Sequence, residues 1–77
     1  MQLPDVDREI LRLAGARYNH EGHRVVAAYD RFGLSETAFW QQVNRLVDDP
    51  AAELAEPEIV HRLRRLRDLR RGRRRAA

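Results

Sequence analysis

The sequence predicts an all-α fold: a small bundle of four to five helices with a helix-turn-helix core and a basic C-terminal helix or arm. Apolar residues recur at helical spacing along almost the whole chain. No stretch alternates apolar and polar residues with the period of two that a half-buried strand requires. Glycine and proline fall where one helix would end and the next begin. At 77 residues, the chain forms one small domain at most.

The first helix is expected to begin near Asp5, because the acidic side chains there suit the positive end of a helix dipole. Its apolar face consists of Val6, Ile10, Leu13 and Ala14. Gly22 then predicts a break, so that a second helix begins at residue 23 or 24. The apolar stripe of this second helix consists of Val25, Ala28, Tyr29 and Phe32.

The string Phe32-Gly33-Leu34-Ser35 predicts a turn between the second and third helices. A glycine accepts the left-handed conformation, and a serine side chain accepts hydrogen bonds from the free amides of the next helix. The third helix is expected over residues 36–47. On a helical projection Trp40 lies at the edge of its core face, which consists of Phe39, Val43, Leu46 and Val47.

Two prolines predict the remaining helices. Asp49 and Pro50 suit the cap and first turn of a short fourth helix, and Pro57 suits the first turn of a fifth. The apolar stripe of the fifth helix consists of Ile59, Val60, Leu63, Leu66 and Leu69. Arg70 interrupts this stripe, so we expect one packed domain over residues 1–69 and a mobile arginine-rich tail over residues 70–77.

Charge is divided unevenly along the chain. Residues 61–77 hold nine arginines and one acid, about +8, whereas residues 1–60 sum to about −5. All fifteen basic side chains are arginine, whose planar guanidinium binds phosphates and base edges through two hydrogen bonds at once. A GC-rich genome would explain arginine in place of lysine but not its clustering. The basic segment is therefore expected to meet a polyanion or an acidic protein surface, unless it is only a solvated tail.

A helix, a glycine turn and a serine-capped helix are typical of a helix-turn-helix motif, whose second helix enters the major groove of DNA. The same pattern also occurs in helix pairs that merely pack together. Glutamine pairs with adenine and arginine with guanine, so the candidate DNA-binding residues of the third helix are Thr37, Gln41, Gln42 and Arg45. The candidate phosphate-binding residues are Arg62, Arg64, Arg65, Arg67, Arg70, Arg71, Arg73, Arg74 and Arg75.

Several other classes of function lack support in the sequence. The chain has no cysteine, no apolar run near the roughly 20 residues that cross a bilayer, and no secretion signal, so we expect a cytoplasmic, nucleoid-associated protein. The pair His20 and His23 has no obvious third metal ligand, and is more simply a surface pair. No side chains are arranged as an activated nucleophile or an acid/base pair, so we expect neither an enzyme nor a cofactor.

Several strings together are similar to a family of small actinobacterial proteins, also found in their phages, that is classed as a domain of unknown function. They are Arg8-Glu9-Ile10-Leu11, Gly22, Phe32-Gly33-Leu34-Ser35-Glu36-Thr37, Asn44-Arg45-Leu46-Val47-Asp48-Asp49-Pro50 and Arg62-Leu63-Arg64-Arg65-Leu66-Arg67. The resemblance implies a helix-turn-helix protein whose middle is similar to the DNA-reading domain of sigma factors. Ala38 departs from the family pattern, which often has a basic residue there.

These observations lead to two hypotheses. The first is a DNA-binding protein, a transcriptional regulator or nucleoid-associated factor, with helix 36–47 in the major groove and the arginine-rich C-terminus on phosphates. The second is an interaction protein that docks on RNA polymerase, a sigma factor or another acidic partner. A second copy of the chain is a further candidate partner, whereas a membrane is not, because the apolar stripe of the fifth helix is needed for the core.

Overall fold

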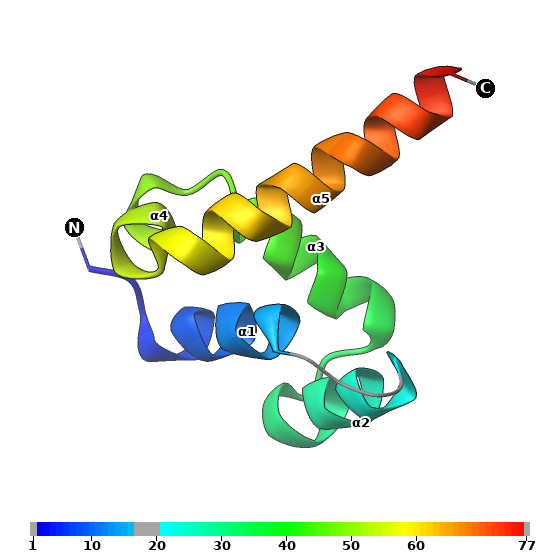
Figure 1. Ribbon diagram of the computed structural model, residues 1–77. Helices are drawn as coiled ribbons and strands as arrows, with labels where there is room; N and C mark the ends of the chain where they lie inside the picture. Colours follow the sequence, from blue (N-terminus) through cyan, green and yellow to red (C-terminus); the bar gives the residue numbers. More distant parts are fainter. Residues whose placement is uncertain (1, 17–20, 77) are drawn as a thin grey trace.

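Five helices make up the described part of the chain and confirm the all-α prediction (Figure 1). The structure, a computed structural model, describes residues 2–16 and 21–76, with the backbone alone at residues 21 and 73–76. The helices are α1 (Asp5–Gly15), α2 (Glu21–Phe32), α3 (Glu36–Leu46), α4 (Pro50–Ala55) and α5 (Pro57–Ala76). No strand occurs in these two ranges.

Helix α1 is the centre of the bundle, because it contacts each of the other four helices. Its buried side chains are Ile10, Leu11, Leu13 and Ala14. Leu11 was not predicted, and it is buried because α1 has neighbours on more than one side. The prediction for Val6 was wrong: it is 60% exposed, since it lies in the first turn of α1, before the helix enters the core.

The boundary between α1 and α2 also differs from the prediction. Helix α1 ends at Gly15, and Gly22 lies inside the first turn of α2 instead of breaking the chain. Gly15 has a packing role, because a Cβ there would lie 2.9 Å from Ile59 and from the guanidinium of Arg62. The absence of a side chain at residue 15 thus allows α5 to approach the end of α1 closely.

The turn between α2 and α3 follows the prediction. Gly33 has a φ of +67°, in the left-handed region, and its N–H donates to the Tyr29 carbonyl at 2.8 Å. Ser35 caps α3, since its hydroxyl accepts a hydrogen bond from the Ala38 amide at 3.2 Å. These two contacts end one helix and start the next within three residues.

The core stripe of α2 is narrower than predicted. Ala28 is fully buried, whereas Tyr29 is 67% exposed, so the prediction for Tyr29 was wrong. A small side chain at residue 28 lets α2 pack closely, and the aromatic ring next to it is turned outward. The predicted core face of α3 is confirmed, because Phe39, Val43, Leu46 and Val47 are all buried.

The start of α4 is also confirmed. The Asp49 carboxylate accepts a hydrogen bond from the Ala51 amide at 2.9 Å, and Pro50 opens the helix. Val47, predicted as the last residue of α3, is instead its C-terminal cap.

Helix α5 leaves the bundle earlier than predicted. Val60 is buried and Leu63 is half-buried, but Leu66 and Leu69 are 47% and 55% exposed. The expectation that packing ends near Leu69 was therefore wrong. Helix α5 extends beyond the helices on which it packs, and its second half projects from the bundle (Figure 1). The radius of gyration of 12.7 Å agrees with this shape, since a compact chain of this length has about 11.5 Å.

The arginine-rich end of α5 is helical as far as Ala76. The mobility predicted for residues 70–77 stays a prediction. No helix in the described ranges is both long and apolar enough to cross a bilayer.

Candidate nucleic-acid interface

The polar face of α3 is open. Its core face fixes the orientation of the helix, so that Thr37, Gln41, Asn44 and Arg45 are exposed on the opposite side. Two of the predicted DNA-binding residues, Thr37 and Gln41, therefore lie on the surface with their polar groups accessible.

The side chains of the other two predicted residues of α3, Gln42 and Arg45, form hydrogen bonds within the protein. The Arg45 Nε donates to the Gln42 Oε1 at 3.0 Å, and its Nη2 donates to the Asp7 Oδ1 of α1 at 3.3 Å. The Asp7 side chain is largely buried, whereas Arg45 is about half exposed. The charge of Arg45 is thus offset by an acid of α1, which leaves less net positive charge at this edge of α3 to attract phosphate.

Asn44 was missed by the sequence reasoning. It lies on the opposite edge of α3, facing α5, and can pair with adenine as glutamine can. A helical projection could have found it, because residue 44 falls between Trp40 and Gln41 on the wheel.

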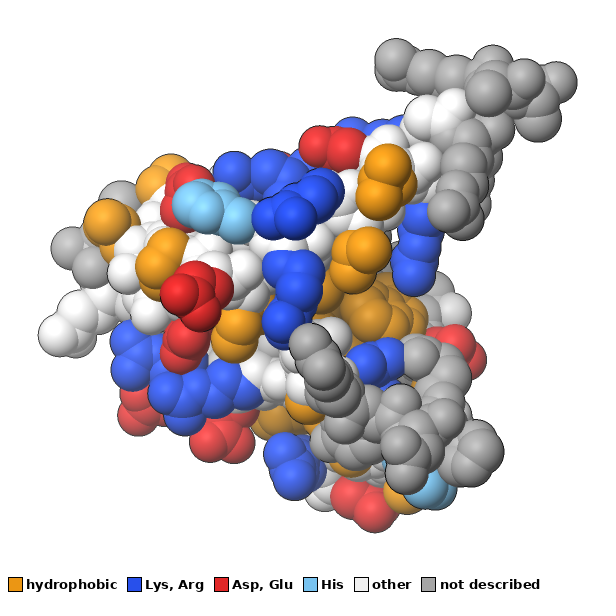
Figure 2. Space-filling view, in the orientation of Figure 1, with side chains coloured by type: hydrophobic (Ala, Val, Ile, Leu, Met, Phe, Trp, Pro, Cys, Tyr) orange, Lys and Arg blue, Asp and Glu red, His pale blue; other side chains and the backbone are white. Residues whose placement is uncertain are grey.

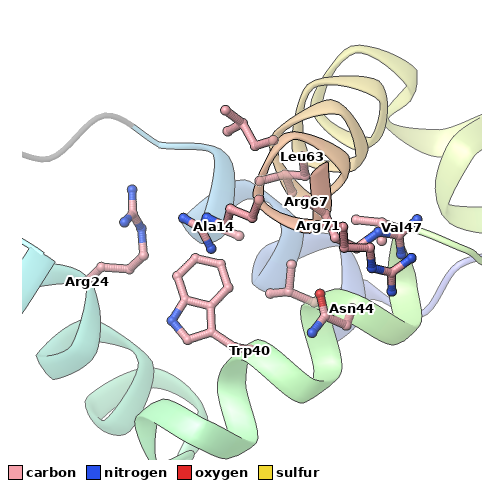
Figure 3. Close-up of a pocket in the computed structure, with 11 residues that line it drawn as sticks. Ala14, Arg24, Trp40, Asn44, Val47, Leu63, Arg67 and Arg71 are labelled. Carbon is pink, nitrogen blue, oxygen red and sulfur yellow. The ribbon is translucent and has the colours of Figure 1, made fainter. Parts of the chain in front are cut away.

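A groove of about 370 Å³ separates α3 from the projecting half of α5. Figure 2 shows arginine side chains along α5 and an apolar floor in the hollow beneath it. Among the residues that the structure describes, every charged residue that lines the groove is an arginine. The lining residues are Ala14, Arg24, Trp40, Val43, Asn44, Val47, Leu63, Leu66, Arg67, Arg70 and Arg71 (Figure 3).

Arg24 extends from α2 into this groove and also caps the C-terminal end of α1. Its guanidinium donates to the carbonyls of Ala16 at 2.8 Å and Leu13 at 3.3 Å, where the negative end of the α1 dipole favours a cation. The same guanidinium lies 5.8 Å from the centre of the Trp40 ring, within the range of a cation–π interaction. Trp40 in turn packs edge-on against Phe39, with ring centres 5.1 Å apart. The floor of the groove is therefore held in place from three helices.

Two of the predicted phosphate-binding arginines of α5 bind the ends of other helices. The Arg62 guanidinium donates to the Gly15 carbonyl at the end of α1, and that of Arg64 donates to the Val47 carbonyl at the end of α3. Arg64 also pairs with Glu53 of α4 at 3.4 Å. These contacts satisfy carbonyls that have no partner within their own helix.

A third arginine, Arg67, forms a two-point pair with Asp48 between α3 and α4. Its two terminal nitrogens donate to the two carboxylate oxygens at 2.9 and 3.2 Å. These hydrogen bonds lower the pKa of the Asp48 carboxyl below its ordinary value. Arg67 therefore holds α5 on the bundle although it also lines the groove.

The remaining described arginines of α5 are Arg65, Arg70 and Arg71. All three are exposed, and none forms a hydrogen bond within the described residues. Arg70 and Arg71 line the groove, whereas Arg65 does not. The side chains of Arg73, Arg74 and Arg75 lie outside the described part of the chain.

The histidines give no sign of a metal site in the described ranges, where no group of three potential ligands occurs. His20 lies outside these ranges, and His23 is exposed at the start of α2. The His61 Nε2 contacts the Glu53 Oε1 at 2.7 Å, and this contact lowers the pKa of the Glu53 carboxyl. His61 is thus occupied with an acid of α4.

The sequence matches the model of a protein family. The family model described as "Protein of unknown function (DUF3263)" matches residues 2–75. Among curated proteins and solved structures, none matches significantly.

Proposed function

The chain belongs to the family described as "Protein of unknown function (DUF3263)", and for it we propose a role in binding double-stranded DNA. The observation that carries this proposal is that the open polar face of α3 borders a groove in which, within the described part of the chain, all the charged lining residues are arginines. A concave surface of one sign concentrates field lines and attracts a polyanion. The neighbouring helix offers amide side chains, which read base edges.

In the proposed complex α3 lies in the major groove, with Thr37, Gln41 and Asn44 toward the bases. Arg45, proposed from the sequence as a guanine reader, has to exchange Asp7 for DNA to take part. The exposed arginines of α5 contact phosphates, and those of residues 73–75 extend this contact along the duplex. We further propose that the protein acts in the cytoplasm as a transcriptional regulator or a nucleoid-associated factor. The proposal includes a similarity between its middle and the DNA-reading domain of sigma factors.

The direct test is a mobility-shift titration of the purified full-length chain with duplex DNA at increasing salt. We expect binding that weakens steeply as salt rises, because each neutralised phosphate releases counterions. Removal of residues 61–77 is too disruptive a variant, since Arg62, Arg64 and Arg67 hold the fold. A chain that ends at residue 72 removes only the last three arginines and should bind every sequence less tightly. No binding in dilute buffer contradicts the proposal.

A second candidate function is docking on an acidic protein surface, such as RNA polymerase or a sigma factor. Two half-exposed leucines of the projecting helix, Leu66 and Leu69, favour this alternative. Exposed apolar side chains are typical of surfaces that bind proteins, whereas the charged backbone of DNA offers them few contacts. Recovery of the tagged chain with polymerase from an extract treated with nuclease supports it. Loss of that recovery after nuclease treatment supports DNA as the link instead.

A further inference from the structure

We infer that the groove between α3 and the projecting half of α5 seats the sugar-phosphate backbone of one DNA strand, with Arg70 and Arg71 as its phosphate contacts. This inference rests on the proposed function and adds which groups do the binding. It also divides the arginines of residues 61–77, which the sequence alone does not distinguish, into two groups: those that stabilise the fold and those that bind the ligand.

The division follows from the hydrogen bonds. Arg62 and Arg64 are bound to main-chain carbonyls, and Arg67 is bound to the Asp48 carboxylate. A guanidinium that gives its donors to the protein has few left for a phosphate. Arg70 and Arg71 keep theirs, because neither forms a hydrogen bond within the described residues and both line the groove.

The groove itself is built for an anion with an apolar part. Arg70 and Arg71 offer their guanidinium groups to a ligand, and Arg24 and Arg67, which are bound to the protein, add positive charge beside them. No acid lines the groove among the residues that the structure describes. Its lining is also partly apolar, since it includes Leu63 and Leu66 from α5 and the ring of Trp40 from α3. Figure 3 shows Trp40 and Leu63 among the lining side chains. A sugar-phosphate strand matches both features, since its deoxyribose carbons can rest on the floor while its phosphates meet the guanidinium groups.

A strand in this groove also fixes how α3 meets the bases. The edge of α3 next to the groove carries Asn44, and Gln41 follows on the exposed side. The opposite edge carries Gln42 and Arg45, and the Arg45 guanidinium is bound to both Gln42 and Asp7. Asn44 and Gln41 are therefore the specificity-determining residues, and Arg45 is not.

The test compares three variants of the full-length chain that each lose one positive charge: Arg70→Gln, Arg71→Gln and the control Arg65→Gln. Arg65 is exposed on the same helix but lies outside the groove. Affinity for a fluorescein-labelled duplex is measured by anisotropy over a series of salt concentrations. The magnitude of the slope of log K against log salt should fall by about 0.9 for each groove variant, and by much less for Arg65→Gln.

A second readout comes from Trp40, the one tryptophan of the chain. Its ring lines the groove, so its emission should change when the duplex binds. The same experiment with poly-L-glutamate controls for the charge of the ligand, and we expect weaker binding and a smaller change in emission.

Three outcomes overturn the inference: an equal loss of slope with Arg65→Gln, duplex binding that leaves Trp40 emission unchanged, or poly-L-glutamate bound as tightly as DNA. In the first two cases the chain still binds duplex DNA and the proposed function stands without the groove. A wild-type chain that binds no duplex at all contradicts the proposed function itself. Circular dichroism of each variant verifies that the helical fold is retained.

Discussion

Arg67 and Asp48 join α5 to the segment between α3 and α4 through two parallel hydrogen bonds of 2.9 and 3.2 Å. The pair lies one turn before Arg71 on α5, where the helix leaves the bundle. It therefore sets the direction in which the second half of α5 projects, and with it the width of the groove.

The first prediction concerns acid stability. Arg67 lowers the pKa of Asp48, so the stabilising contribution of this carboxylate is complete above its unfolded-state pKa of about 4 and is lost as pH falls through the lower folded-state value. Asp48→Asn should therefore flatten the decline of the melting temperature below about pH 4. The effect should be small, because Asp48 is well exposed to solvent. Thermal melts followed by circular dichroism measure it, and identical acid profiles of the two proteins would contradict the assignment.

The second prediction separates the arginines by their effect on stability. Arg64→Gln should destabilise the fold by about 1 kcal/mol, because the Val47 carbonyl loses a charged donor and Glu53 loses an ion-pair partner. Arg65→Gln, which alters the next residue of the same helix, should change stability by less than about 0.5 kcal/mol. Urea unfolding of the two variants gives the comparison. Equal losses would mean that the contact between Arg64 and Val47 adds nothing.

The third prediction concerns two glycines with opposite roles. Gly33→Ala should destabilise the fold by about 1 kcal/mol, since an alanine at a φ of +67° is strained. Gly72→Ala should raise the helix content, because residue 72 lies within α5 with open space around it and alanine favours a helix by about 1 kcal/mol over glycine. Urea midpoints and far-ultraviolet circular dichroism report the two effects. A neutral Gly33→Ala variant would show that the turn tolerates another conformation.

The fourth prediction concerns sequence preference in DNA. Asn44→Ala should relax the preference at one base position and cost about 1–3 kcal/mol on the preferred site, as the loss of a two-point contact to a base does. Arg45→Ala should leave the preference intact, because that guanidinium is held by Asp7 and Gln42. Selection of bound duplexes from a random pool, followed by sequencing, compares the variants. The reverse result, in which only Arg45→Ala relaxes the preference, would contradict this prediction and make Arg45 the residue that reads a base, as the sequence pattern favours.

Local signals in the sequence were sufficient for the helix caps. Ser35 and Asp49 bind amides two or three residues away, so neighbouring residues alone determine these contacts. The core face of α3 was also predictable, since helical spacing fixes which side chains share a side. Periodicity does not say what lies opposite that side. Val6 and Leu69 lie at positions suited to an apolar face, but their side chains are 60% and 55% exposed.

The roles of the arginines could not be predicted for a related reason. Arg62 and its acceptor carbonyl at Gly15 are 47 residues apart, and Arg67 and Asp48 are 19 apart. The sequence shows a cluster of equal charges, and only the packing of α5 decides which of them meet carbonyls, a carboxylate or the groove. For Asn44, a helical projection places the residue beside Gln41, but only the packing of α5 shows that this edge of α3 borders the groove.

The projecting half of α5 has a consequence for how its helix responds to ions. Arg67, where α5 leaves the bundle, lies three residues before Arg70 and four before Arg71, and like charges at these spacings disfavour a helix by about 0.2–0.5 kcal/mol a pair. Little packing offsets this repulsion in the projecting half. Added salt screens the charges, so it should raise the helix content of this segment while it lowers the affinity for a polyanion. Ionic strength would thus act on the two properties in opposite directions.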